Sequence, residues 1–176
     1  MDKPLTKPVF EARRLGFFVS FGCVACSGSV DDTEVGPDPP EEIVTSVDTP
    51  SADVIGVSAT GGPDAWTVSV TVRSDDLGCE QYADWWEILS ADEALIYRRV
   101  LRHSHSGEQP FTRASESPVE VDGDVNLYVR AHLSPGGYVG TVFGGTLNEG
   151  FIQVSLPLGF GSGLEDLAPQ PEGCLY

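Results

Sequence analysis

Two histidines, His103 and His105, stand one residue apart and are the side chains of this chain best spaced to bind a metal ion. Alternate residues of a β-strand point to the same face, so both imidazoles can reach one ion. The third ligand would be His132, on another predicted strand, or Glu108, just past the pair. Neutral imidazoles with an optional carboxylate suit zinc, copper or iron. Hydrogen bonding as ordinary loop and strand-end residues is the alternative for these histidines.

The run from His103 to Glu108 is similar to the first motif of cupins, which also place a His-x-His ahead of a glutamate. Here the glutamate comes too early, the flanking glycines are missing and no second motif follows around His132. The sequence also contains no Gly-x-Ser-x-Gly, Walker, dinucleotide-binding or Cys-x-x-Cys motif. It therefore predicts no enzyme active site.

An aromatic segment, residues 82–89, holds a candidate ligand platform formed by Trp85 and Trp86. Adjacent residues of a strand face opposite ways, so we expect one tryptophan in the core and the other free to contact a sugar or a peptide. Asp84 and Glu87 lie in the same segment. We expect them to pair with arginines of neighbouring strands, namely Arg98, Arg99 or Arg113, rather than to act as a glycosidase pair.

These candidate residues lie in or beside short segments in which apolar and polar residues alternate, as they do in β-strands. Trp66, Val68, Val70 and Val72 alternate with polar residues and predict a half-buried strand. Residues 82–89 and 95–102 flank a turn at residues 90–94 and predict a hairpin, with a single helix over residues 84–101 as the competing interpretation. Further strands are expected at residues 55–59, 125–133, 138–143 and 151–156.

About seven or eight short strands separated by turns predict an all-β fold, a two-sheet antiparallel sandwich, over residues 53–176 with a C-terminal tail. The pattern resembles immunoglobulin-like and fibronectin type III-like domains, although the cysteine pair that joins the sheets of antibody domains is missing. A jelly roll is the alternative. A disulfide is expected between Cys79 and Cys174. The other two cysteines, Cys23 and Cys26, lie at the end of a predicted export signal, and two further cysteines in an exported protein favour a disulfide.

The first 25 residues have the layout of an export signal. Basic residues up to Arg14 precede an apolar run over residues 15–25, which is shorter than the ~20 residues that a membrane-spanning helix needs. Val24, Ala25 and Cys26 resemble the lipobox of bacterial lipoproteins, and Cys23 is the alternative modified residue. The resemblance implies that residues 1–25 are removed and that Cys26 carries lipid, palmitate included. It also implies a cell-envelope location, and Ser27 favours the outer membrane in a host with two membranes.

Residues 26–52 are rich in acidic residues, serine and proline and predict a disordered linker between the lipid and the sandwich. The whole chain has a formal net charge of −17. Such a charge repels phosphate backbones, so no nucleic acid is expected as a partner. The sequence predicts a binding or structural module at the envelope, with an envelope protein or polysaccharide as partner. The alternative is an exported metal-binding protein that holds zinc or copper through His103, His105 and His132.

Overall fold

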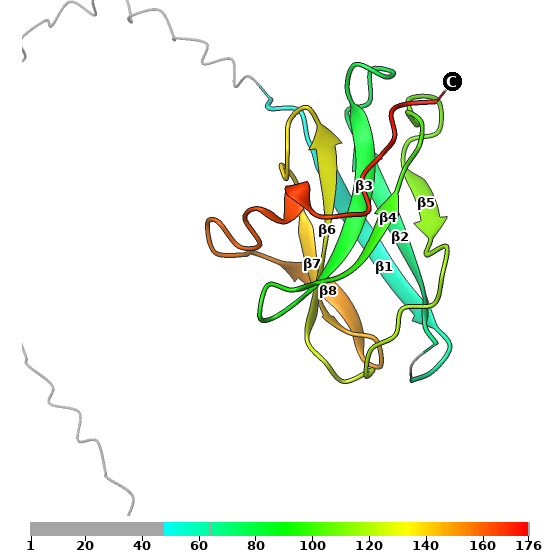
Figure 1. The fold of residues 1–176 in the computed structure, drawn as a ribbon, viewed down its shortest axis with the longest axis vertical. Helices are drawn as coiled ribbons and strands as arrows, with labels where there is room; N and C mark the ends of the chain where they lie inside the picture. The colour runs from blue at the N-terminus through cyan, green and yellow to red at the C-terminus, as the bar shows by residue number, and fades with distance from the viewer. Residues whose placement is uncertain (1–47, 64, 176) are drawn as a thin grey trace, which may run out of the picture. The chain divides into compact units, whose positions relative to one another are not determined.

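The computed structural model of the chain describes residues 48–63 and 65–175. The leader, Cys26 and the predicted linker up to residue 47 lie outside the described residues. Within the described part, eight β-strands are followed by one short 3₁₀ helix, η1 (Leu164–Asp166) (Figure 1). The strands are β1 (Ala52–Thr60), β2 (Thr67–Ser74), β3 (Tyr82–Ser90), β4 (Leu95–Val100), β5 (Phe111–Ala114), β6 (Leu127–Ser134), β7 (Val142–Thr146) and β8 (Gly150–Val154).

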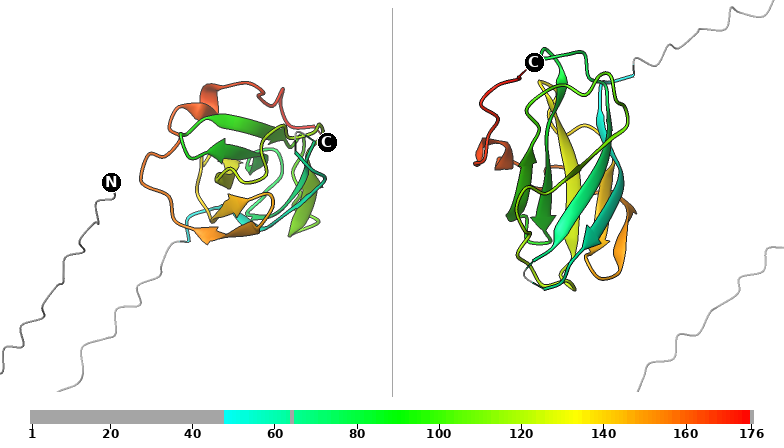
Figure 2. Two further views of the ribbon diagram at one scale, coloured as in Figure 1. Left: turned by 90° about the horizontal axis from the view of Figure 1, so that it is seen from below. Right: turned by 90° about the vertical axis from the view of Figure 1, so that its right-hand side faces the viewer.

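The strands form two antiparallel sheets. One sheet has the order β1-β2-β5 and the other the order β4-β3-β6-β7-β8. The two layers are visible end-on in Figure 2. The all-β, two-sheet sandwich predicted from the sequence is therefore confirmed. The competing helix over residues 84–101 is wrong, because that segment forms β3, a turn and β4.

The core between the sheets comes from the alternating positions that the sequence marks. From β2, Val68, Val70 and Val72 are fully buried, and Trp86 and Ile88 of β3 meet them from the other sheet. Burial of one such aliphatic side chain contributes about 1.5–3 kcal/mol, so this layer supplies much of the driving force for folding.

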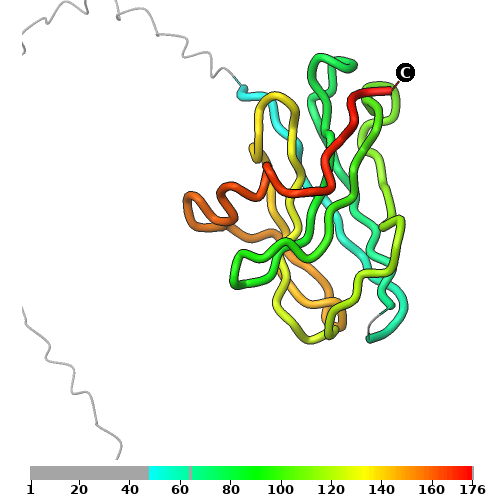
Figure 3. Tube along the Cα trace, in the orientation of Figure 1, coloured from blue at the N-terminus to red at the C-terminus, as the bar shows by residue number. Residues whose placement is uncertain are grey.

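The strand β3 is buried on both faces, unlike a typical strand of an antiparallel sheet with one solvated face. Its inner face meets the core. Its outer face is covered by the C-terminal segment, defined here as residues 157–175. Figure 3 traces this segment as it runs across β6, β3 and β4. The predicted C-terminal tail is thus a part of the folded domain.

A disulfide fixes the end of the C-terminal segment. Cys174 is bonded to Cys79, in the loop before β3, with a Cα–Cα distance of 5.5 Å across 95 residues of sequence. The pairing expected from the sequence is confirmed. Because the closed loop is long, the bond removes considerable entropy from the unfolded chain.

We predict that Cys174→Ser lowers the free energy of unfolding by up to about 4 kcal/mol, the entropy of closing a loop of this length. Urea denaturation followed by tryptophan fluorescence measures the change. The double variant Cys79→Ser/Cys174→Ser is the control and should match the single variant. An unchanged denaturation midpoint would show that the bond adds nothing to stability.

Candidate functional site

The outer face of the five-stranded sheet carries a buried group of charges centred on Glu87. The register places Arg98 of β4 and Arg130 of β6 directly opposite Glu87 on either side. Arg98 donates to Oε2 of Glu87 at 2.9 and 2.6 Å, and Arg130 donates to Oε1 at 2.8 Å. The Glu87 side chain is fully buried. The expected pairing of Glu87 with Arg98 is confirmed, and Arg130 is an additional partner.

The two arginines also hold the C-terminal segment by its backbone. Arg98 donates to the carbonyl oxygens of Leu164, Leu167 and Pro169 at 2.6, 2.5 and 3.2 Å. Arg130 donates to the carbonyl oxygens of Phe160 and Gly161 at 2.8 and 3.0 Å. A Cβ at residue 161 would lie 3.0 Å from Nη2 of Arg130, and φ there is +63°, so glycine suits this close approach. The two arginines therefore attach the C-terminal segment to the outer face of the sheet.

A second polar pair, Asp84 and His132, lies on the same face. A shift of register after Ala83 turns Asp84 toward β6, and its carboxylate meets Nδ1 of His132 at 2.6 Å. The His132 ring stacks on Trp85 with centroids 3.9 Å apart. Burial raises the pKa of Asp84, although the hydrogen bond and charge of His132 oppose this rise. His132 is thus held by an ordinary structural pair.

The predicted ligand platform of Trp85 and Trp86 is not present. Trp86 is fully buried in the core, and Trp85 is 3% exposed, with the ring of His132 stacked on it. The guanidinium of Arg98 lies 4.5 Å from the centre of the Trp85 ring. The expectation of one solvated tryptophan assumed an open outer face, and the C-terminal segment covers that face. Neither indole is available to a sugar or a peptide.

The metal site predicted from His103, His105 and His132 is not assembled as a set of three. The strand β4 ends at Val100, so His103 and His105 lie in the following loop rather than on a strand. Their rings are nevertheless close, with centroids 4.6 Å apart. His132 belongs to β6, and β3 lies between β6 and β4. The residue that joins the pair is Glu108, and the ligand atoms of His103, His105 and Glu108 all lie within 4.8 Å of one another.

His105 is the buried member of this histidine cluster, which comprises His103, His105 and Glu108. It is 2% exposed, and its ring stacks on Phe111 with centroids 3.8 Å apart. Burial, followed by the charges of Arg113 and His103, lowers the pKa of His105 to about 4. The imidazole is therefore neutral at physiological pH and can act as a ligand without first losing a proton.

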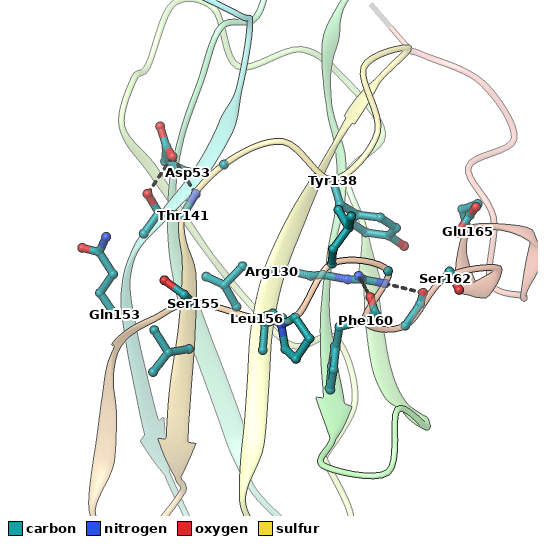
Figure 4. Close-up of a pocket in the computed structure, with 17 residues that line it drawn as sticks. Asp53, Arg130, Tyr138, Thr141, Gln153, Ser155, Leu156, Phe160, Ser162 and Glu165 are labelled. Carbon is teal, nitrogen blue, oxygen red and sulfur yellow. Dashed lines mark hydrogen bonds between the residues drawn. The ribbon is translucent and has the colours of Figure 1, made fainter.

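A pocket of about 620 Å³ opens beside β8 and the start of the C-terminal segment (Figure 4). Arg130 and Tyr138 form its inner wall, with the guanidinium 3.5 Å from the centre of the Tyr138 ring. Burial and the Glu87 carboxylate raise the pKa of Tyr138 to about 12. Its other lining combines polar and apolar side chains, including Asp53, Gln153, Ser155, Leu156, Phe160 and Glu165. The volume lies in the range of small-molecule sites, which is about 300–1,000 Å³.

The pocket was not predicted from the sequence. It forms where residues 138–142 and 153–162 meet the first residues of β1, and these segments are far apart in the chain. Asp53 of β1 joins two of them, because its carboxylate accepts hydrogen bonds from the N–H and the hydroxyl of Thr141 at 2.7 and 2.8 Å. Only the glycines and Pro157 of this region signal irregular backbone in the sequence.

Comparison with known proteins finds similarity to a protein described as a lipoprotein. A protein of Halomicrobium mukohataei described as a "Putative lipoprotein" is 37% identical to this chain over 101 residues. The match covers 57% of this chain and 49% of the relative, so the chain spans about half the length of that protein. No protein-family model matches the chain, and no solved structure matches it. Residues 48–63 and 65–175 include no helix with the length and apolar character to cross a membrane.

We predict that Glu87→Gln lowers the free energy of unfolding by about 3–5 kcal/mol, because it leaves two buried arginines without their counter-charge. The matched control is Glu116→Gln, which removes the partner of Arg99 at a 56% exposed carboxylate and should cost no more than about 1 kcal/mol. Chemical denaturation measures both. Equal losses in the two variants would contradict the structural role of Glu87.

We predict that the stability of the chelator-treated protein depends on pH through His105. The folded-state pKa of about 4 lies below the ordinary histidine pKa of 6.5, which applies to the unfolded chain. The contribution of neutral His105 is therefore present above pH 6.5 and is lost as the pH falls from 6.5 toward 4. His105→Gln should flatten the stability profile in this window, whereas His103→Gln removes only a lesser cause of the lowered pKa of His105 and should keep most of the wild-type dependence. Parallel profiles for all three proteins would refute the assignment.

Proposed function

We propose that this protein is a lipid-anchored protein of the cell envelope, whose sandwich domain acts as a binding module outside the membrane. The observation that carries the proposal is the relative described as a lipoprotein, together with the lipobox-like residues that end at Cys26. The acyl chain on Cys26 attaches the protein to the membrane. Residues 27–51 then separate the lipid from the sandwich, whose first strand begins at Ala52.

The strand order supports the immunoglobulin-like form of the sandwich. Numbered along the chain, β1, β2 and β5 share one sheet, and β3, β6 and β7 share the other. Strands A, B and E of immunoglobulin-like domains are likewise separated from strands C, F and G. Many domains of cell-surface proteins share this architecture. This similarity favours a binding role and assigns no catalytic activity.

The pocket beside β8 provides the binding surface in this proposal. Its exposed polar side chains, Gln153, Ser155, Ser162 and Glu165, can form hydrogen bonds with a polar ligand, and Leu156 and Phe160 offer apolar contact. An envelope protein or polysaccharide is the partner class that fits both the location and this mixed lining. The expected outer-membrane location in a two-membrane host stays a prediction.

We predict that Cys26→Ser abolishes membrane attachment, because it removes the thiol to which lipid is joined. The protein is produced in its native host and partitioned with a detergent that separates into two phases. Wild type should enter the detergent phase, and its N-terminal peptide should carry the mass of acyl chains on residue 26. The variant should stay in the aqueous phase.

Cys23→Ser is the matched control and should leave both the partition and the mass unchanged. Lipid found on residue 23 would move the anchor by three residues and keep the envelope assignment. An N-terminal peptide without lipid, in a protein that stays in the aqueous phase, would overturn the proposal.

A further inference from the structure

We propose that His103, His105 and Glu108 form a binding site for a divalent transition metal ion in the loop between β4 and β5. Two imidazole nitrogens and one carboxylate oxygen lie within 4.8 Å of one another there. A modest movement of side chains brings such atoms to about 2.0–2.2 Å from a shared ion. This inference is independent of the lipid anchor.

The loop that carries the ligands is held by a buried carboxylate, Asp76. Its Oδ2 accepts the backbone N–H of His105 at 2.6 Å and the hydroxyl of Ser104 at 3.2 Å. Its Oδ1 accepts the hydroxyl of Ser74 at 2.6 Å and the N–H of Ala83 at 2.9 Å. Asp76 thereby ties the loop to the ends of β2 and β3. The backbone under the cluster is fixed before an ion arrives.

The buried ring of His105 lacks a hydrogen bond among the described residues. Its Nδ1 is buried without a partner, and its Nε2 lies 3.8 Å from Oε1 of Glu108, beyond hydrogen-bond distance. A buried polar atom without a partner carries an energetic cost, so such rings normally find one. An ion held between Nε2 of His105 and Glu108 gives the ring one partner through Nε2, while Nδ1 stays buried without one. His103 is exposed and can close on the ion from the solvent side.

The charge that opposes this site is Arg113. Its Nη2 lies 2.6 Å from Oε1 of Glu108, so the guanidinium occupies the carboxylate in the absence of metal. The pair is partly solvated, with side chains 28% and 50% exposed, and such pairs contribute little stability. An ion can therefore displace Arg113 from Glu108. The competition lowers the affinity, and removal of Arg113 should raise it.

The ligand types select the class of metal. Imidazole with one carboxylate suits Zn²⁺, Cu²⁺ and Ni²⁺, whereas Mg²⁺ and Ca²⁺ prefer sites made of oxygen alone. Three protein ligands leave a coordination position for water. The hollow that His103, His105 and Arg113 line together gives that position access to solvent.

The test is titration with Zn²⁺ against a chromophoric chelator, after the protein has been stripped of metal. The protein carries no histidine tag, and Cys23 and Cys26 are replaced by serine so that no free thiol competes. We expect one ion per chain. Glu108→Gln and His103→Gln should each weaken binding at least tenfold, and Arg113→Gln should tighten it several-fold. Mg²⁺ at the same concentration should not compete.

The matched control is His132→Gln, which removes a histidine outside the cluster and should leave the affinity unchanged. His105→Gln should abolish binding, and circular dichroism checks that it folds. If it does not fold, the exposed variants at residues 103 and 108 decide the outcome. Substoichiometric binding, or binding that is unaffected by Glu108→Gln and Arg113→Gln, would overturn the proposal and indicate adventitious association with surface histidines.

Discussion

One carboxylate, that of Glu87, determines how the outer half of this sandwich is built. It accepts hydrogen bonds from arginines on both neighbouring strands, and those arginines use their remaining donors on the carbonyl oxygens of the C-terminal segment. Charges buried in this way are tolerated only when every group has a partner. The arrangement meets this condition because the segment presents backbone oxygens at the places where the guanidinium groups point.

The sequence was sufficient for the elements whose pattern is local. Val68, Val70 and Val72 alternate with polar residues, and they lie in the core as this alternation predicts. The turn at residues 90–94 likewise predicted the β3–β4 hairpin. The Cys79–Cys174 bond followed from the number of cysteines left after removal of the leader. Each of these inferences depends on a short segment of sequence or on the number of cysteines. None of them requires knowledge of the tertiary structure.

The features that were missed depend on contacts between segments that are far apart in the sequence. His132 was expected to join His103 and His105, but β3 separates its strand from β4. Trp85 was expected to offer an exposed face, but His132 and Arg98 lie against its ring, and Arg98 is held there in turn by the C-terminal segment. Residues 157–175 have no regular alternation that would predict this packing. Glu108 was one of the two third ligands considered, and it is the one that joins the histidine cluster. The loop turns back after His105, where the N–H of Glu108 donates to the carbonyl oxygen of His105.

The position of the C-terminal segment in the chain has a consequence for biosynthesis. The backbone oxygens that cover Arg98 and Arg130 belong to residues that follow all eight described strands in the sequence, so the ribosome adds them after those strands. A nascent chain can pair these strands earlier, but Arg98 and Arg130 remain hydrated until residues 160–169 have been synthesised. Premature termination before residue 160 would therefore yield a polypeptide with the eight described strands and with two uncovered arginines on its outer face, a species suited to recognition by chaperones and proteases.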